Sequence, residues 1–170
     1  GVFTDQFISQ IKNNVTDFDP QQLAMIANGV SKFGEDLCNR VFTDQFIKQI
    51  KNNVTDFDTQ QLAMIVNGVS KGGEELCNRL FSDQFIKQIQ EKLTDFEPRH
   101  LSMIANGVGR GGEDVCKRVF TDQFIEQIKD KVFQFKVHEL AMIANGVSRS
   151  GVGVCNRVFT DQFISQIENN

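Results

Sequence analysis

The apolar residues of this chain recur with the spacing of an α-helix. Asp19 followed by Pro20 is typical of a helix N-cap with proline at the first helical position, and Lys32 before Gly34 is typical of a helix end. We predict a short helix of about 13 residues between these signals. Its apolar face has residues spaced i, i+3, i+4 and i+7, namely Leu23, Ile26, Ala27 and Val30.

A second, longer apolar pattern runs from about Glu35 to about Val54. Its apolar positions cover a wide arc, which is typical of a helix held between neighbouring helices. Thr43-Asp44-Gln45 could cap a fresh helix inside this stretch and give three helices per unit. We expect two, because no other residue there breaks the chain. The apolar positions are Leu37, Cys38, Val41, Phe42, Phe46, Ile47, Ile50 and Val54.

The whole pattern returns every 39 residues without an insertion or deletion. Self-similarity at such a period is typical of stacked helical units, each too small to bury its own apolar face. The sequence therefore predicts an all-α fold, an α-solenoid of tandem two-helix repeats that coil into a right-handed superhelix. The predicted units are a partial repeat over 1–17 and repeats over 18–56, 57–95, 96–134 and 135–170. The register is visible in Phe3, Phe42, Phe81, Phe120 and Phe159, and in Met25, Met64, Met103 and Met142.

Each predicted short helix also contains a glycine in register. A glycine inside a helix costs about 1 kcal/mol relative to alanine, so its return in every unit predicts close approach of a neighbouring helix. These glycines are Gly29, Gly68, Gly107 and Gly146.

Composition narrows the function classes. The formal net charge of −4 does not indicate a bulk-basic nucleic-acid binder, although it leaves a local basic stripe open. No apolar run approaches the roughly 18 residues that a membrane span needs. No targeting signal is visible either. The chain begins and ends with near copies of one segment, so we expect a fragment of a longer array, and missing targeting signals carry little weight.

A polar stripe lies opposite the apolar face of each predicted short helix. Its first residue varies, whereas a Met, an Asn and a cation are kept. A modular reader of single-stranded RNA needs such a pattern: cations contact phosphates, constant amides bind a base edge or ribose, and variable side chains discriminate bases. A merely solvated helix face would look the same. The four sets are Gln21, Met25, Asn28 and Lys32; Gln60, Met64, Asn67 and Lys71; Arg99, Met103, Asn106 and Arg110; and His138, Met142, Asn145 and Arg149.

The residue after the first stripe position varies as well. We include these side chains among the candidate RNA contacts: Gln22, Gln61, His100 and Glu139.

The residues of the first repeat resemble a known family. Residues 18–24 (Phe-Asp-Pro-Gln-Gln-Leu-Ala) and 29–34 (Gly-Val-Ser-Lys-Phe-Gly) are similar to the octotricopeptide repeat, a helical repeat of organellar RNA-binding proteins. That family is related to the repeats that precede RAP domains and to those of FAST-kinase-like proteins. The resemblance implies binding of single-stranded organellar rRNA or mRNA, in RNA metabolism or ribosome assembly, in a mitochondrion or plastid. The chain departs from the family pattern in the short helix, where residues 25–31 (Met-Ile-Ala-Asn-Gly-Val-Ser) stand in place of Leu-Trp-Ala-Leu-Ala. Thr59 and Val137 replace the proline found at Pro20, and the family's proline-rich stretch between the two helices is missing.

Other recurring polar residues have structural explanations. We expect the arginines Arg40, Arg79, Arg118 and Arg157 to pair with acidic residues of an adjacent turn rather than with RNA. The cysteines Cys38, Cys77, Cys116 and Cys155 lie 39 residues apart, whereas zinc sites use closely spaced pairs, so we expect buried free thiols in a reducing compartment. The aspartates Asp5, Asp44, Asp83, Asp122 and Asp161 fit capping or helix-face roles. We find no catalytic constellation and no implied cofactor or metal.

The sequence thus predicts a non-catalytic RNA-binding repeat protein. Two other functions stay open. One is a protein-interaction scaffold, favoured by the negative net charge and by exposed methionines, which suit adaptable apolar contacts. The other is duplex DNA reading, because TAL-effector-like arrays also begin each unit with a Pro-Gln short helix.

Overall fold

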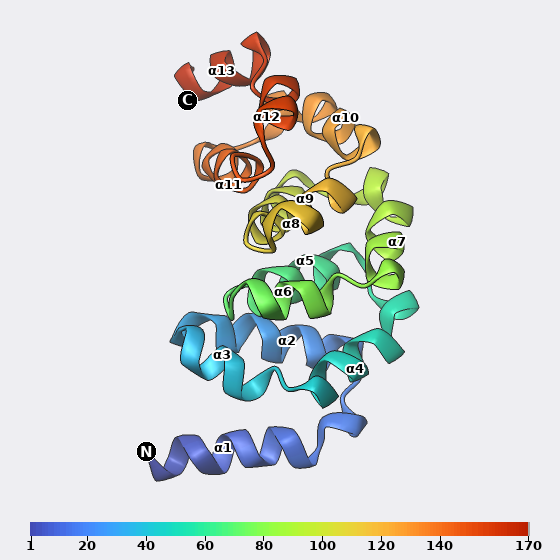
Figure 1. Cartoon of the computed structure of the whole chain (residues 1–170), viewed down its shortest axis with the longest axis vertical. Helices are drawn as coiled ribbons and strands as arrows, with labels where there is room; N and C mark the ends of the chain where they lie inside the picture. Colours follow the sequence, from blue (N-terminus) through green and yellow to red (C-terminus); the bar gives the residue numbers. More distant parts are fainter. Residues whose placement is uncertain (170) are drawn as a thin grey trace.

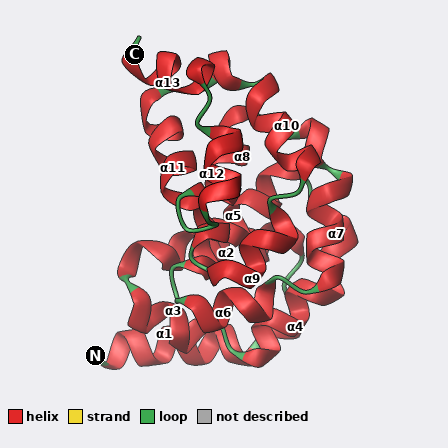
Figure 2. Ribbon diagram, turned by 45° about the horizontal axis from the view of Figure 1, so that its top comes forward, coloured by secondary structure: helices red, strands yellow, loops and turns green. Residues whose placement is uncertain are grey.

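The computed structural model describes residues 1–169, apart from the side chain of Phe3. The described residues form thirteen α-helices and five short 3₁₀ turns and contain no β-strand (Figure 2). None of these helices is long and apolar enough to cross a membrane. The all-α prediction is therefore confirmed for this part of the chain. Asn170, the last residue of the predicted fourth repeat, lies outside it.

Four helices of 11 or 12 residues form the central layer of the molecule. Each one packs against the next, so that they follow one another between the two chain ends (Figure 1). Their first residues are 39 positions apart, as the sequence register requires. They are α2 (Pro20–Val30), α5 (Thr59–Ser70), α8 (Pro98–Gly109) and α11 (Val137–Val147).

The prediction of one long helix after each short helix is wrong, because this segment forms two helices. Thr43 starts the second of them by accepting a hydrogen bond from the backbone N–H of Phe46 at 3.2 Å. The first helices of these pairs are α3 (Glu35–Val41), α6 (Glu74–Leu80), α9 (Gly112–Val119) and α12 (Val152–Val158). The second are α4 (Asp44–Asn52), α7 (Asp83–Glu91), α10 (Asp122–Asp130) and α13 (Asp161–Glu168).

Short 3₁₀ turns connect the units. In Figure 1, α4, α7 and α10 lie along one edge of the molecule, and the chain returns from each of them to the central layer. Helix α1 (Val2–Asn13) precedes the first complete unit. The connecting turns are η1 (Val15–Asp17), η3 (Val54–Asp56), η4 (Leu93–Asp95) and η5 (Val132–Gln134), whereas η2 (Ser31–Phe33) extends α2.

The breaks between paired helices bring two phenylalanine rings of each pair together, and all of them except the partly buried Phe159 lie in the core. The rings of Phe42 and Phe46 lie 5.2 Å apart between centroids, and both residues are at most 1% exposed. Aromatic pairs at this distance contribute beyond the apolar area that they bury. The same pair recurs in the later units as Phe81 and Phe85, Phe120 and Phe124, and Phe159 and Phe163.

The predicted close approach at the helical glycines is confirmed for three of the four. A Cβ atom at Gly68 would overlap the backbone of Ala27 on α2, and one at Gly146 would overlap the backbone of Ala105 on α8. At Gly107 it would lie 2.5 Å from Cγ1 of Val66. Gly29 has nothing within 4 Å of that position, because no described helix covers that face of α2.

Candidate nucleic-acid interface

The central helices begin at capping residues that fix their N-termini. Asp19 accepts a hydrogen bond from the N–H of Gln22 at 2.8 Å, and the Gln22 side chain accepts one from the N–H of Asp19 at 3.1 Å. Asp58 and Gln61 form the same reciprocal pair at 2.8 and 3.0 Å. This capping box satisfies backbone donors that the first helical turn leaves free. Gln22 and Gln61, which we predicted to contact RNA, are therefore engaged in holding helix ends.

The equivalent residues of the last two units are buried. Glu139 is 4% exposed and accepts a hydrogen bond from the N–H of Lys136 at 2.8 Å. His100 is 5% exposed, and its Nδ1 has no hydrogen-bond partner among the described residues. Burial, with the charge of Arg99 nearby, lowers the pKa of His100. Side chains as buried as His100 and Glu139 are not accessible to a ligand, whereas Gln22 and Gln61 are more exposed but are held in capping boxes. None of these four side chains is therefore free to contact RNA in the way that we predicted.

The first stripe position faces solvent in all four units. Its side chains lie near the N-terminal ends of the central helices: Gln21, Gln60, Arg99 and His138. Between α2 and α5 a shallow hollow of about 310 Å³ separates successive units. Gln21 and Gln60 line it together with Met25 and Met64, while Asp58 places a carboxylate at its edge. The hollow thus offers amide groups and thioethers to a ligand at the junction of two repeats.

The asparagines of the stripe form a row on the surface. Asn28, Asn67 and Asn106 are partly exposed and Asn145 is exposed. The side-chain amide of Asn145 donates a hydrogen bond to Oδ1 of Asn106 at 2.8 Å. The amides of Asn106 and Asn145, which belong to neighbouring units, therefore lie side by side. Each retains donor or acceptor capacity for a second partner.

The cations of the stripe lie where the central helices end. Lys71 and Arg110 are the C-cap residues of α5 and α8 and are partly buried, whereas Lys32 and Arg149 are exposed. Burial and the nearby charge of Arg110 lower the pKa of Lys71, so these two cations are neighbours. Nε of Arg110 has no hydrogen-bond partner within the described residues. A cation at a helix C-terminus also interacts favourably with the helix dipole, which is a structural role for the same residues.

The second arginine row pairs with acidic residues, as predicted, but the partners lie in the preceding unit and not only in an adjacent turn. Arg40 contacts Asp5 at 2.5 Å, and Arg118 contacts Asp83 at 2.6 Å. Each pair joins residues 35 positions apart, so it spans two successive units. The hydrogen bond from Arg40, together with its charge, lowers the pKa of Asp5. The remaining pairs are Arg79 with Asp44 and Arg157 with Asp122.

The cysteines are free thiols, as predicted, and three of the four are buried. Burial raises the pKa of Cys77 to about 12 and that of Cys116 to about 11. It also raises the pKa of Cys38. Because the thiolate is the reactive and metal-binding form, these side chains are inert at neutral pH. No three His, Cys, Asp or Glu side chains within residues 1–169 come together as a metal site would require.

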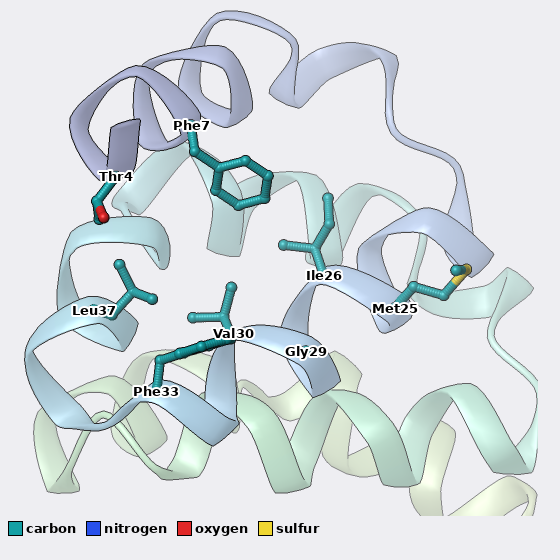
Figure 3. Close-up of a pocket in the computed structure, with 8 residues that line it drawn as sticks. All are labelled: Thr4, Phe7, Met25, Ile26, Gly29, Val30, Phe33 and Leu37. Atoms are coloured by element: carbon teal, nitrogen blue, oxygen red, sulfur yellow. The ribbon is translucent and has the colours of Figure 1, made fainter. Parts of the chain in front are cut away.

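The sequence did not reveal an apolar groove at the N-terminal end of the molecule. Figure 3 shows Phe7 of α1, Ile26 of α2 and Leu37 of α3 directed into it. Phe33, which is exposed, lies at its rim. One signal for this groove was present: the positions equivalent to Phe33 are the small residues Gly72, Gly111 and Ser150.

Comparison of the chain with protein-family models, with curated proteins and with solved structures gives no match.

Proposed function

We propose that this chain is an α-solenoid of 39-residue repeats that binds single-stranded RNA along its central helices. The observation that carries the proposal is the surface row of asparagines, in which the amide of Asn145 meets that of Asn106 at 2.8 Å. One amide per repeat, at the same register position in every unit, would provide a partner for each successive nucleotide of an extended strand. The solenoid coils as a right-handed superhelix, and its place of action is a mitochondrion or plastid, as the octotricopeptide resemblance implies.

The roles of the interface residues follow from their chemistry. The cations Lys32, Lys71, Arg110 and Arg149 contact phosphates, which supplies affinity without sequence preference. The asparagines bind base edges or ribose hydroxyls. The variable first position discriminates bases, because it presents an amide, a guanidinium or an imidazole. The RNA-contacting set is Gln21, Asn28, Lys32, Gln60, Asn67, Lys71, Arg99, Asn106, Arg110, His138, Asn145 and Arg149.

Charge reversal of the cation row tests this proposal. Replacing Lys32, Lys71, Arg110 and Arg149 with glutamate should abolish binding of a fluorescent single-stranded RNA pool, measured by anisotropy. A matched control reverses four lysines on α1, α4 and α7, so that the net charge changes equally: Lys12, Lys48, Lys51 and Lys87. The control should retain most of the affinity, and circular dichroism should show that both variants are folded. Equal loss in the two variants would mean that only net charge matters.

Salt dependence provides an independent measure of the same contacts. Four phosphate contacts to a single strand predict a slope of log K against log salt near −2.8, at about −0.7 per contact, or roughly fiftyfold weaker binding at 200 mM than at 50 mM salt. The control variant should keep this slope. Competition between single-stranded RNA and duplex DNA tests the second alternative, because a DNA reader would bind the duplex more tightly. A protein partner that is retained at fixed stoichiometry after nuclease treatment, with no RNA affinity, would instead indicate a scaffold.

A further inference from the structure

The apolar groove at the N-terminal end resembles an interface that the molecule builds three times internally. The groove has a volume of about 670 Å³ and is lined by Ile26, Gly29, Val30 and Leu37 of the first unit, together with Phe7. Ile26 is partly exposed, whereas its equivalents in the next three units, Ile65, Ile104 and Ile143, are fully buried. The groove therefore has the composition of a repeat interface with one side uncovered.

Inside the molecule, each such surface is covered by the central helix of the preceding unit. Helix α2 covers α5 so closely that the backbone of Ala27 occupies the space beside Gly68. Helix α8 covers α11 in the same way, with the backbone of Ala105 beside Gly146. Gly29 is equivalent to Gly68 and Gly146, and the space beside it is empty. A central helix with a small residue at the Ala27 position is thus the partner that this groove fits.

The C-terminal end of the same chain carries the matching surface. Ala141 and Ala144 on α11 are exposed and partly exposed. Their equivalents in earlier units are Ala24 with Ala27, Ala63 with Val66, and Ser102 with Ala105, and all of these are at most 1% exposed. Helix α13 also leaves apolar residues uncovered: Ile164 is 44% exposed, whereas its equivalent Ile125 is 1% exposed. The two ends are therefore complementary in the way that successive repeats are complementary.

The two terminal segments of the chain share one ten-residue sequence but bury opposite sides of their helices. Residues 2–11 are identical to residues 158–167. Helix α1 buries its isoleucine side but leaves Phe7 52% exposed, whereas α13 buries Phe163 and leaves its isoleucine side exposed. A single helix of this sequence placed between two copies would bury both its phenylalanine side and its isoleucine side. Suppose that α11 of one copy covers α2 of the next copy. The α13 helix of the first copy then requires the position that α1 of the second copy occupies, so α13 replaces α1.

A charge contact supports this replacement. Asp5 on α1 pairs with Arg40 at 2.5 Å, and Asp161 is the equivalent residue on α13. No ion pair of Asp161 is found within residues 1–169. In the exchanged arrangement Asp161 takes Arg40 of the next copy and restores the pair that Asp5 gives up.

We propose that this groove binds a second copy of the chain, whose α11 covers α2 and whose α13 replaces α1. The contact is heterologous, because a C-terminal surface meets an N-terminal one. Such contacts continue from copy to copy unless a ring closes. The proposal concerns the ends of the stack and is independent of RNA binding.

The test measures the mass of the 170-residue protein without RNA. Sedimentation velocity from about 1 µM to about 1 mM should show masses that rise with concentration beyond two copies. Gly29→Ala adds a Cβ atom that meets nothing in the single chain but overlaps the helix docked from a second copy. It should weaken association by at least about tenfold. Gly153→Ala is the matched control, because this glycine of α12 also has open space around it. The residues equivalent to Gly153 in earlier units, Glu75 and Asp114, are exposed although neighbouring units pack on both sides of them. Docking should therefore leave position 153 uncovered, and Gly153→Ala should not change association.

A second variant acts on the opposite end. Ile164→Glu places a charge on a side chain that is partly exposed in the single chain and that docking would bury, so it should also weaken association. Circular dichroism checks that each variant is folded. The proposal is wrong if the protein stays monomeric over this range, if its mass stops at two copies, or if Gly29→Ala and Gly153→Ala associate equally.

Discussion

At the residue scale, His100 shows how one register position changes its role between units. The equivalent glutamines Gln22 and Gln61 are exposed or partly exposed and close capping boxes, whereas His100 is buried with an unpartnered Nδ1. Its unit has Glu97 at the N-cap, and the Glu97 side chain makes no capping hydrogen bond. Burial of the imidazole therefore disfavours its charged form, and the nearby charge of Arg99 acts in the same direction.

This burial predicts a pH-dependent stability. Because the folded protein lowers the pKa of His100 below 6.5, the unfolded chain binds a proton that the folded chain does not. Stability should fall as pH decreases through 6.5 towards the folded-state value. His100→Gln should flatten the decline of the free energy of unfolding measured by urea denaturation between pH 7 and pH 5. His138→Gln, at an exposed position, is the control. A decline that is unchanged in His100→Gln would contradict the assignment.

At the element scale, one sequence forms two structures. Residues 2–8 and 41–47 are both Val-Phe-Thr-Asp-Gln-Phe-Ile, yet the first stretch lies within the continuous helix α1 and the second contains the break between α3 and α4. The break buries Phe42 and Phe46 together, whereas Phe7 in the unbroken helix stays half exposed. Packing between units, and not local preference, therefore decides whether the chain bends here.

Features set by local preference could be predicted from the sequence, whereas most features set by packing between units could not. Signals within one turn of helix were readable, such as Asp19-Pro20 as a helix start. The close approach at Gly68 was readable for a different reason, because a glycine recurs at that position in every unit. An ionic role for Arg40 was also predicted, whereas its partner Asp5 was assigned to capping or to a helix face. The helix break and the burial of His100 and Glu139 depend on contacts between units. A pattern along the chain does not record which side of a helix a neighbouring unit covers.

The helix caps give a prediction that compares two units. Asp58→Ala removes the acceptor for the N–H of Gln61 and should lower the free energy of unfolding by about 1 kcal/mol. Glu97→Ala removes only an exposed carboxylate that pairs with Arg99 at 3.1 Å, and should change it by less than about 0.5 kcal/mol. Urea denaturation with an unchanged m-value is the measurement. Equal losses of unfolding free energy in the two variants would show that the capping hydrogen bond does not contribute to stability.

At the scale of the whole molecule, contacts link each unit mainly to its neighbours. The largest interfaces are those between α2 and α5, α5 and α8, and α8 and α11. Side-chain bonds follow the same rule: Asn39 on α3 donates to the carbonyl of Gly72 at 2.9 Å, and Asn78 on α6 donates to that of Gly111 at 3.3 Å. Stability in such a stack is approximately a sum of units and nearest-neighbour interfaces.

A substitution that disrupts one interface should consequently destabilise only the units beside it. Gly68→Ala forces a methyl group against the backbone of Ala27, so α2 and α5 must separate, at a cost of roughly 1–3 kcal/mol. Native-state hydrogen exchange should then show that amides of α1, α2 and α3 lose protection while those of α8 and α11 retain theirs. Gly29→Ala, with open space around its new methyl group, is the control and should leave all of these amides protected at concentrations where the chain is monomeric. If Gly68→Ala lowers protection equally from α2 to α11, the units unfold together and the additive description of this stack is wrong.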